Sequence, residues 1–281
     1  MPELPEVETV KEVLKSKLIK LTIKDVFIHY DKMIKTSDRV QFKDQLIGQK
    51  FMDIKRRGKY LIFELADYHL LSHLRMEGKF FYGDDERVRD KHVHAEFLLC
   101  SGLKLRYEDV RKFGTFHLYE KAIDLKTTFV LSRLGPEPWS DEFNEAAVMM
   151  FFKGKKKPIK SMLLSQNVVA GLGNIYVDEV LFAANVHPMK RSCDLTPVEV
   201  KNVVHHTREI LSRAIRHKGS TIRTFATYHP SAGEFQKFLQ VHTKKDEPCP
   251  RCTARILKTT VGGRGTYFCA VCQPEVPQFK P

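Results

Sequence analysis

The sequence lacks any apolar run close to the roughly 20 residues that a membrane-spanning helix needs. Its first residues, Met1–Glu6, contain no basic stretch leading into an apolar one, so we expect neither membrane insertion nor secretion. Internal repeats and low-complexity tracts are also missing. The 281 residues are 42% hydrophobic and 29% charged, which allows packed cores and argues against disorder. The length favours two domains.

Acidic residues are in short supply. The chain has 34 Asp and Glu against 47 Lys and Arg, which gives a net charge of +13 and a pI near 9.4. The basic excess is larger in the C-terminal half. Such a balance favours a polyanionic partner, most often nucleic acid, with an acidic membrane surface as the alternative.

The cysteine spacing is that of a zinc site and not of a disulfide framework. Four of the six cysteines form two C-x2-C pairs that are 16 residues apart. Four thiolates complete a tetrahedron and leave no position for water, so we expect one structural Zn²⁺ that orders the tail beyond Glu247. Chance pairing is the alternative, and Cys100 and Cys193 are interpreted as isolated thiols. The predicted ligands are Cys249, Cys252, Cys269 and Cys272.

The first half of the chain combines one helix with many short strands. Residues 3–18 carry apolar side chains at helical spacing, namely Val7, Val10, Leu14 and Leu18. From about 21 to 119, short β-branched and aromatic runs alternate with glycines, as strands do with turns. We predict an antiparallel β domain with a leading helix, either a sandwich or barrel-like. The clearest runs are 21–30, 60–65, 94–99 and 113–119.

The second half turns helical after a proline-rich segment. Leu134–Pro138 contains two prolines and a glycine and is the best linker candidate. Thr196–Glu199 forms a capping box that opens a helix expected to run to about Lys218. The fold class is therefore α+β. The predicted buried positions of this helix are Val200, Val203, Val204, Ile210, Leu211 and Ala214.

Two glycine-rich segments are candidate anion sites. Residues 262–265 place Arg264 at the tip of a predicted hairpin, where glycines let phosphate approach; a solvated turn arginine is the alternative. In residues 169–176, a helical segment is predicted to end at the glycines and another to begin with Asn174 as N-cap; an ordinary helix hairpin is the alternative. Upstream lysines favour phosphate, although a lysine run is commonly a solvated face. They are Lys153, Lys155, Lys156, Lys157 and Lys160.

The N-terminus offers a nucleophile. Removal of an initiator methionine is favoured before a small residue, so Pro2 would carry a free secondary amine with a pKa of about 7.7–8.0. Such an amine can attack an aldehyde-like carbon and form an iminium, which promotes loss of the adjacent proton. Glu3 and Glu6 provide carboxylates for proton transfer. A plain acidic helix start is the alternative.

Residues 2–10, Pro-Glu-Leu-Pro-Glu-Val-Glu-Thr-Val, resemble the N-terminus of the formamidopyrimidine-DNA glycosylases, bacterial base-excision repair enzymes for oxidised purines. In all, eight segments resemble this family's motifs in order, from residue 2 to Gln273, and this resemblance favours the functional interpretations above. The other seven are 56–61, 72–78, 91–94, 109–114 and 134–138, the glycine segment at Asn174, and the zinc hairpin with Arg264.

The resemblance implies an N-terminal β-sandwich domain, a helix–two-turn–helix domain and a C-terminal zinc finger. We assign these to residues 1–135, 136–242 and 243–281, the last including the tail. It further implies damaged double-stranded DNA as the partner, a monomeric state, and a bacterial cytoplasmic location, nucleoid-associated through DNA. Residues 219–241 resemble the loop that closes on an oxidised purine, and the tail from Gln273 onward is expected to be disordered.

The resemblance also implies the catalytic residues of a bifunctional glycosylase and lyase. Pro2 would attack the sugar C1′, and Glu3 would manage protons on the base and sugar. Lys59 would donate a proton in β-elimination and Arg264 in δ-elimination. Glu6 is the fifth catalytic residue that the resemblance implies.

The remaining implied residues contact DNA. A flipped base leaves a gap, and the residues expected to fill it are Met76, Arg111 and Phe113, with Arg111 directed at the orphaned cytosine. Ordinary core packing is the alternative for Met76 and Phe113. Residues 92 and 94 alternate in Lys91–His94 and are predicted to share a strand face. The expected phosphate or DNA contacts are His73, His92, Lys155 and Asn174.

Two other functions stay open. An endonuclease VIII-type glycosylase for oxidised pyrimidines typically begins Pro-Glu-Gly-Pro-Glu, whereas this chain has Leu4. A non-catalytic zinc-finger DNA-binding protein would have little physical need for Pro2, Glu3, Glu6 and Lys59 together. The purine glycosylase is the prediction.

Overall fold

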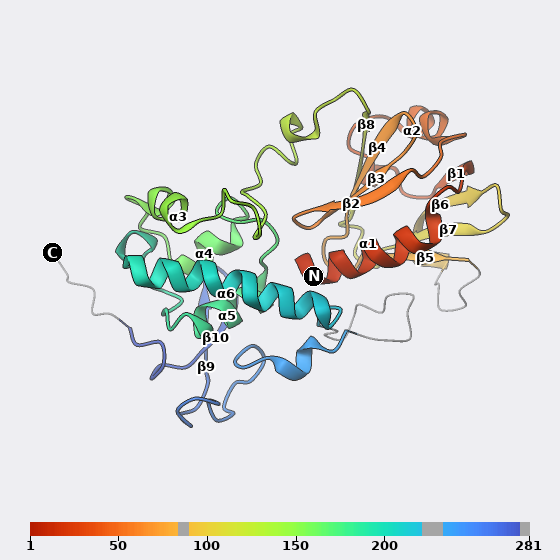
Figure 1. The fold of residues 1–281 in the computed structure, drawn as a ribbon. Helices are drawn as coiled ribbons and strands as arrows, with labels where there is room; N and C mark the ends of the chain where they lie inside the picture. The colour runs from red at the N-terminus through yellow and green to blue at the C-terminus, as the bar shows by residue number, and fades with distance from the viewer. Residues whose placement is uncertain (84–89, 221–232, 276–281) are drawn as a thin grey trace. The chain divides into compact units, whose positions relative to one another are not determined.

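The computed structural model describes residues 1–83, 90–220 and 233–275, and the chain forms two compact units (Figure 1). The first unit comprises 1–132 and 217–234, and the second comprises 133–216 and 235–281. The division into domains 1–135, 136–242 and 243–281 stays a prediction. Within the described ranges, no helix is both long and apolar enough to cross a membrane.

Helix α1 (Leu4–Leu18) opens the first unit and confirms the helix predicted for residues 3–18. Glu3 is its N-cap residue, and Pro5 lies in the first turn, where a missing backbone N–H leaves no helical hydrogen bond unmade. The predicted apolar positions are all buried in the core of this unit: Val7, Val10, Leu14 and Leu18.

The first unit contains two four-stranded antiparallel sheets, with strand orders β1-β6-β7-β5 and β2-β3-β4-β8. All four runs predicted as the clearest strands overlap a strand, so the β domain is confirmed. The strands are β1 (Ile23–Ile28), β2 (Asp53–Arg57), β3 (Tyr60–Glu64), β4 (Tyr68–His73), β5 (Lys79–Tyr82), β6 (Val93–Leu99), β7 (Lys104–Glu108) and β8 (Thr115–Glu120).

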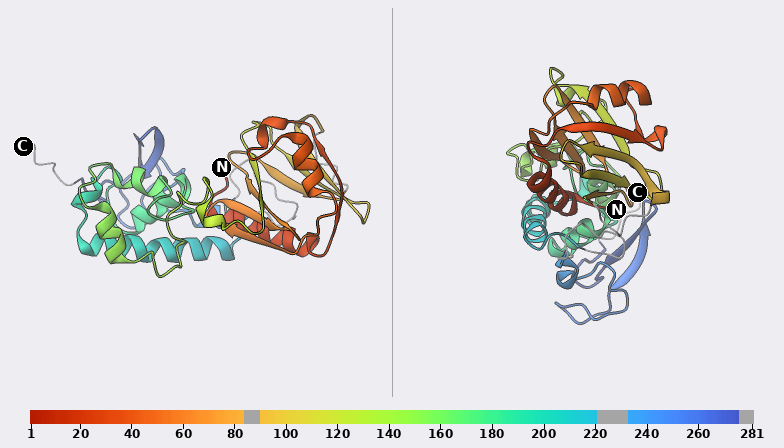
Figure 2. Two further views of the ribbon diagram at one scale, coloured as in Figure 1. Left: turned by 90° about the horizontal axis from the view of Figure 1, so that it is seen from above. Right: turned by 90° about the vertical axis from the view of Figure 1, so that its right-hand side faces the viewer.

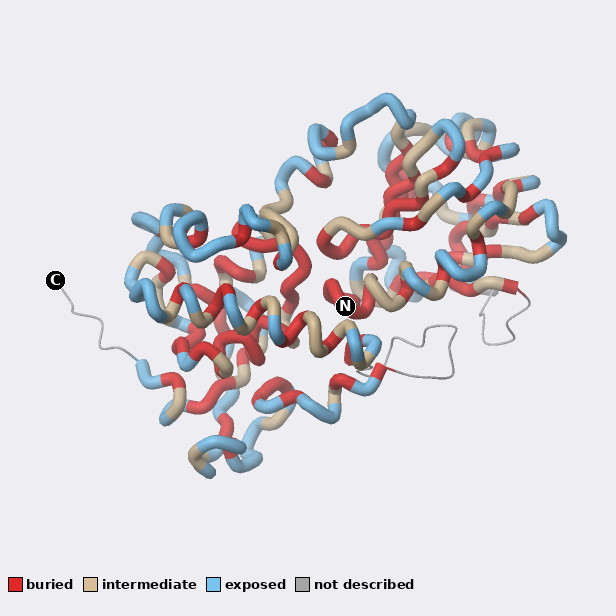
Figure 3. Tube along the Cα trace, viewed as in Figure 1, coloured by how far each residue is buried: buried red, intermediate tan, exposed pale blue. Residues whose placement is uncertain are grey.

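One apolar core joins both sheets with α1 and makes the unit a sandwich. Buried residues run along α1 and along strands of both sheets (Figure 3). A second helix, α2 (Arg39–Leu46), packs against β1 and was not predicted (Figure 2). Asp38 caps it, since its carboxylate accepts the N–H of Gln41 at 2.9 Å. Only Phe42 and Leu46 of this helix are buried, too few to give a periodic signal.

The second unit is helical and ends in a β-hairpin, and α6 packs against α3 and α5. Its elements are α3 (Glu145–Phe152), α4 (Ile159–Leu164), α5 (Asn174–Ala183), α6 (Pro197–Arg216), β9 (Leu257–Val261) and β10 (Arg264–Phe268). Short 3-10 turns in the chain are Asp31–Met33, Asp90–His92, Leu125–Thr127, Ser192–Asp194 and Phe235–Phe238.

Helix α6 confirms the predicted capping box. The backbone N–H of Thr196 donates to Oε2 of Glu199 at 2.7 Å, and the N–H of Glu199 donates to Oγ1 of Thr196 at 3.3 Å. The helix ends at Arg216, slightly before the expected Lys218. All six predicted buried positions are buried.

The segment before Asn174 differs from the prediction of two helices joined by a tight turn. Residues 166–171 form bends, and Asn174 is the first helical residue of α5, whereas Gly173 is the N-cap. The reason is that Gln166 replaces helical hydrogen bonds. Its Oε1 accepts the N–H of Gly171 at 2.9 Å, and Gly171 adopts a φ of +102° that a helix cannot contain.

The predicted linker Leu134–Pro138 is packed within the second unit. The carbonyl of Pro136 accepts the N–H of Ala170 at 2.9 Å. A Cβ on Gly135 would lie only 2.3 Å from the carbonyl oxygen of Asn167. Glycine is therefore needed here for close backbone contact, and the segment is not a free connection.

The C-terminal tail is ordered at its first residue, contrary to the prediction. Gln273 is fully buried, its Nε2 donates to the carbonyl of Val186 at 2.8 Å, and its Oε1 accepts the N–H of Cys269 at 3.0 Å. The side-chain amide thus ties the end of the hairpin to the helical part of the unit. Residues 276–281 lie outside the described residues.

Candidate active site and zinc centre

The start of α1 buries two carboxylates next to Pro2. Glu3 is 2% exposed and Glu6 is 5% exposed, and Pro2 is also buried. The backbone N–H of Glu3 donates to Oε2 of Glu6 over 2.9 Å, which fixes the turn that carries Pro2. Met1, whose removal the predicted chemistry requires, is 46% exposed.

The other oxygen of Glu6 holds a distant segment of the first unit. Oε1 accepts the backbone N–H of Ser220 at 2.7 Å and its hydroxyl at 3.3 Å. A Cβ on Gly219, which has a φ of +77°, would lie 2.4 Å from this oxygen. Both carboxylate oxygens of Glu6 therefore hold backbone N–H groups in place. This segment begins the predicted purine loop 219–241, of which residues 221–232 lie outside the described ranges.

Lys59 lies in the tight turn between β2 and β3 and is 6% exposed. Arg56 links this turn to α1: its Nε donates to Oε2 of Glu8 at 2.6 Å, and its Nη1 donates to the carbonyl of Gly58 at 3.1 Å. Burial alone would raise the pKa of Glu8. Hydrogen bonds from Lys11 and Arg56 outweigh this effect of burial, so the pKa lies below its usual value. The ionised Glu8 thus anchors the turn that carries Lys59.

His73, at the end of β4, is neutral and held in one tautomer. Burial, followed by the charges of Arg75 and Lys59, lowers its pKa well below the usual 6.5. Its Nδ1 accepts the backbone N–H of Arg75 at 2.9 Å, which leaves the proton on Nε2. His73 can therefore donate one hydrogen bond through Nε2 without carrying charge.

The three predicted gap-filling residues lie at the surface of the first unit. Phe113 is 51% exposed, Arg111 is exposed and Met76 is half-buried, so none is an ordinary core residue. The guanidinium carbon of Arg111 lies 4.8 Å from the centre of the Phe113 ring, a cation–π contact. Each segment contains a non-glycine residue in the left-handed region, Arg75 at φ +53° and Lys112 at φ +57°.

His92 and His94 do not share a strand face, contrary to the prediction. His92 ends the 3-10 turn Asp90–His92 and is half-buried, whereas β6 begins at Val93. His94 is buried, and its Nε2 lies 2.7 Å from the carbonyl oxygen of Asp109. A register shift between Val93 and Ala95 breaks the simple alternation of side chains at this end of the strand.

In the second unit, Asn174 contacts the hairpin at Gly265, the residue next to Arg264. Gly262 and Gly263 form the two-residue turn at φ +55° and +74°, which confirms the predicted hairpin, and exposed Arg264 begins β10. Nδ2 of Asn174 donates to the carbonyl of Gly265 at 2.9 Å. The second N–H of this amide can serve another acceptor.

The lysine cluster divides into exposed and buried members. Lys155 is exposed, with its Nζ 4.7 Å from the centre of the Phe151 ring, and Lys153, Lys156 and Lys157 are exposed too. Lys160 is fully buried, so it fits neither the predicted phosphate cluster nor the alternative of a solvated lysine face. Its Nζ donates to Oδ1 of Asp178 at 2.6 Å and to the carbonyl of Gly265 at 3.0 Å.

Sequence reasoning missed two adjacent buried acids on α5, Asp178 and Glu179. Oδ2 of Asp178 lies 2.8 Å from Nδ1 of His242, and the carboxylate of Glu179 accepts three backbone N–H groups of residues 240–242 at 2.8 to 3.0 Å. Burial raises the pKa of Glu179 despite these bonds. Two adjacent acids within the apolar helix Asn174–Ala183 were the available signal.

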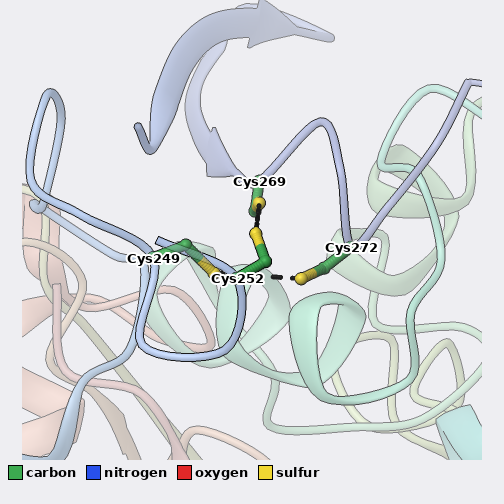
Figure 4. A group of neighbouring side chains, drawn as sticks. All are labelled: Cys249, Cys252, Cys269 and Cys272. Carbon is green, nitrogen blue, oxygen red and sulfur yellow. Dashed lines mark hydrogen bonds between the residues drawn. The ribbon is translucent and has the colours of Figure 1, made fainter. Parts of the chain in front are cut away.

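The four predicted zinc ligands come together in the second unit. Their sulfur atoms all lie within 4.8 Å of one another, and Figure 4 shows the four side chains with dashed lines on two of the sulfur contacts. Cys249 and Cys272 are 3.8 Å apart at sulfur, and Cys252 and Cys269 are 3.4 Å apart. These distances exclude disulfides and approach the roughly 3.8 Å between thiolates that share a tetrahedral Zn²⁺. The cluster fits one structural zinc ion.

Comparison with known proteins assigns a family to these features. Residues 1–116 match the formamidopyrimidine-DNA glycosylase N-terminal domain, residues 134–226 match the H2TH domain of the same enzymes, and residues 246–274 match the zinc finger found in FPG and IleRS. Together these matches describe a DNA glycosylase with a helical H2TH domain and a zinc finger.

Full-length relatives and solved structures agree. The chain is 43% identical to the formamidopyrimidine-DNA glycosylase of Bacillus cereus over 98% of its own length and all of the relative's, and 46% identical to that of Halalkalibacterium halodurans over 97% and 100%. A Lactococcus lactis FPG mutant in complex with Fapy-dG-containing DNA superposes with a TM-score of 0.91 at 43% identity, over 98% of this chain and all of that one. The chain belongs to the formamidopyrimidine-DNA glycosylase family.

Proposed function

We propose that this chain removes oxidised purines from damaged double-stranded DNA and then cuts the strand at the abasic site. The first activity, N-glycosidic cleavage in base-excision repair, is that of the family to which the chain belongs. The strand cut goes further and assigns a lyase reaction to this chain's own residues. The observation that carries it is the buried turn at the start of α1, where Glu3 and Glu6 lie next to Pro2.

In the proposed reaction, Met1 is first removed and Pro2 becomes the N-terminal residue. Its secondary amine forms a bond to C1′ of the damaged nucleotide as the bond from C1′ to the base breaks. Glu3 gives and takes the protons on the base and on the sugar ring oxygen. Opening of the ring leaves an iminium between Pro2 and C1′, which acidifies the proton at C2′.

Two eliminations then follow from the iminium. Loss of the C2′ proton expels the 3′ phosphate, and a second elimination expels the 5′ phosphate and leaves a one-nucleoside gap. Lys59 supplies a proton in the first elimination and Arg264 in the second. The contacts of Glu6 favour a different role, because both of its oxygens hold backbone N–H groups; Glu6 is a positioning residue for Pro2 and for the segment at Ser220.

DNA contacts come from both units. His73 donates a neutral hydrogen bond to phosphate, and His92, Lys155 and Asn174 are further backbone contacts. Met76, Arg111 and Phe113 occupy the gap left by the flipped base. The zinc ion holds the hairpin that presents Arg264. The protein acts as a monomer in the bacterial cytoplasm, at the nucleoid.

Borohydride trapping tests this proposal with a duplex that carries 8-oxoguanine opposite cytosine. The wild-type protein, with a mass spectrum that starts at Pro2, should form a stable covalent adduct because borohydride reduces the iminium. Pro2→Gly should cleave slowly and keep most of its DNA affinity. Pro5→Gly is the matched control, since it also removes a buried proline near the start of α1 but leaves the terminal amine intact.

The same experiment distinguishes the alternatives. A non-catalytic DNA-binding protein would bind the duplex tightly and give no adduct at all. Cleavage by Pro2→Gly at the wild-type rate would remove Pro2 from the nucleophile role. Cleavage of a duplex with an oxidised pyrimidine in preference to 8-oxoguanine would favour the endonuclease VIII-type activity.

A further inference from the structure

We infer that Asp109 and Tyr107 are positioning residues that hold Met76, Arg111 and Phe113 ready to enter the DNA. The inference rests on the proposed function and extends it from the residues that touch DNA to those that set their geometry. All five residues belong to the first unit. Met76 lies in the turn 74–78, whereas Arg111 and Phe113 lie in the loop 109–114.

The buried carboxylate of Asp109 organises the second of these segments. It is 1% exposed, and it accepts three backbone N–H groups of its own loop. Oδ1 accepts from Arg111 at 3.0 Å, and Oδ2 accepts from Phe113 at 2.9 Å and from Gly114 at 2.7 Å. Charge-assisted bonds of this kind are stronger than neutral ones, so one side chain fixes the backbone on both sides of the exposed tip.

The backbone of Asp109 ties the same loop to β6. Its N–H donates to the carbonyl of His92 at 3.0 Å, and its carbonyl oxygen lies 2.7 Å from Nε2 of His94 and accepts the N–H of Lys112 at 3.2 Å. Lys112 is thereby held in the left-handed region, at φ +57°. A non-glycine residue stays in this conformation only where its surroundings impose it.

Tyr107 connects this loop with the Met76 turn. It is 1% exposed, and its hydroxyl oxygen lies where a side chain on either of two glycines would have to go. A Cβ on Gly114 would be 1.7 Å from this oxygen, and a Cβ on Gly78 would be 2.2 Å from it. Neither glycine has a positive φ, so what requires glycine at both positions is close approach to Tyr107.

The Met76 turn is closed on its other side by a backbone bond. The N–H of Gly78 donates to the carbonyl of Leu74 at 3.0 Å, and Arg75 within the turn has a φ of +53°. Since Tyr107 packs against the last residue of each segment, its position sets the separation of the two segments. Exposed Arg111 and Phe113 have little packing of their own, so these buried neighbours pre-organise them.

The test uses Asp109→Asn, which keeps the shape of the side chain. An amide offers one acceptor oxygen, and its NH₂ group would face backbone donors that need an acceptor. We expect the variant to bind undamaged DNA like the wild type. Its preference for excising 8-oxoguanine opposite cytosine over adenine should fall about tenfold, because displacements near 1 Å at a site can cost up to about a hundredfold.

Fluorescence of 2-aminopurine next to the lesion gives a second readout. The wild type should produce a signal change when the gap is filled, and Asp109→Asn should lose most of it. Glu179→Gln is the matched control, because Glu179 is also a buried carboxylate that accepts three backbone N–H groups, but in the second unit. It should lower stability and leave both the opposite-base preference and the 2-aminopurine signal as in the wild type.

A double-mutant cycle tests whether Asp109 acts through Arg111 and Phe113. In a background of Arg111→Ala and Phe113→Ala, Asp109→Asn should reduce the preference no further. If Asp109→Asn does not fold, Gly78→Ala provides the test, since its methyl group must displace Tyr107 or the Met76 turn and should reduce the 2-aminopurine signal.

Folded variants with the wild-type preference and signal would overturn the inference. So would additive effects in the cycle, which would mean that Asp109 acts independently of these residues. A wild-type protein that neither excises 8-oxoguanine nor responds to it would contradict the proposed function instead. The two failures are therefore distinguishable in one set of measurements.

Discussion

The two units hold their proposed site residues by different means. In the first unit, a single apolar core joins both sheets with α1 and α2, and the buried turn with Glu3 and Glu6 begins α1. In the second, a fully buried ion pair lies under the hairpin, and the apolar cluster there is small. That cluster consists of Phe182, Val241, Cys249, Ile256 and Cys269. Buried carboxylates hold site segments in the first unit too, at Glu6 and Asp109, so the difference lies in the metal-binding cluster that the second unit adds.

The chain offers a natural way to follow one unit alone. Trp139 is the only tryptophan of the sequence and lies in the second unit, where its Nε1 donates to Oγ of Ser212 at 3.0 Å. Tryptophan fluorescence therefore reports on the second unit, and far-ultraviolet circular dichroism reports on both. Differences between the two signals separate the failure of one unit from that of the other.

Removal of zinc should have the largest effect on the second unit. Structural zinc contributes roughly 10–16 kcal/mol of apparent binding free energy in small fingers, more than the small cluster around Ile256 can replace. Chelation, or Cys249→Ser, should unfold the hairpin, weaken binding to damaged and undamaged duplexes alike, and leave the strand signal of the sandwich in place. Cys100→Ser, at an exposed thiol of the first unit, is the control. Full DNA affinity after verified zinc loss would contradict this expectation.

Breaking the buried ion pair should have the next largest effect. Lys160→Met leaves Asp178 buried with His242 as its remaining side-chain partner, and removal of one partner of a buried pair costs roughly 3–5 kcal/mol. Denaturant unfolding followed by Trp139 fluorescence should shift to lower concentration. The sandwich should unfold as in the wild type.

The control for this prediction is an exposed pair in the first unit. Lys15 and Asp53 form an ion pair with 44% and 28% of their side chains exposed, so Lys15→Met should change the unfolding free energy little. The double variant Lys160→Met with Asp178→Leu should recover part of the loss, since it leaves no unpaired carboxylate. An unchanged fluorescence midpoint in Lys160→Met would show that the pair does not support the unit.

Acid should weaken the first unit through two buried histidines. Burial, followed by the charges of Lys35 and Arg75, lowers the pKa of His117 to about 4, and His73 is shifted in the same direction. The unfolded chain takes up these protons near the ordinary pKa of 6.5, so the stabilisation is complete above pH 6.5 and is lost as the pH falls towards about 4. Each histidine contributes a slope of at most about 1.4 kcal/mol per pH unit in that window.

Replacement of one histidine should reduce this slope. His117→Gln should lose less stability than the wild type between pH 6.5 and pH 4, measured as the thermal midpoint of the strand signal. His205→Gln is the control, because that side chain is 70% exposed on α6 in the second unit. An identical pH dependence of wild type and His117→Gln would mean that His117 is not buried in its neutral form.

The sequence was sufficient to predict those elements whose structure depends on residues close to one another along the chain. The period of apolar residues predicted α1, the capping box at Thr196 predicted α6, and the cysteine spacing predicted the zinc cluster. The first two signals depend on residues within a few turns of one another, and the four cysteines lie within 24 consecutive residues. The resemblance extended them to site residues that no spacing could assign.

Most of the predictions that failed concern residues whose structure depends on contacts with segments far away along the chain. Lys160 is buried because Asp178 and the carbonyl of Gly265 reach it from other parts of the chain. Gln273 is ordered because the carbonyl of Val186 accepts its side-chain N–H. Sequence patterns carry no record of such partners. The failure at Asn174 is local instead, because Gln166 shapes the bends that precede it.

The smallest expected effect distinguishes how each unit contacts phosphate. Lys155 in the second unit brings a charge, so Lys155→Ala should reduce the slope of log K against log salt by about one, since each neutralised phosphate contributes about 0.9. His73 in the first unit is neutral, because burial keeps its pKa well below 6.5. His73→Gln should therefore weaken binding and leave the slope unchanged.

Titration of both variants at several salt concentrations, with intact and damaged duplexes, measures both quantities. Both substitutions should affect the two duplexes alike, because backbone contacts carry little information about the lesion. A reduced slope in His73→Gln beside an unchanged slope in Lys155→Ala would mean that the charged contact lies in the first unit.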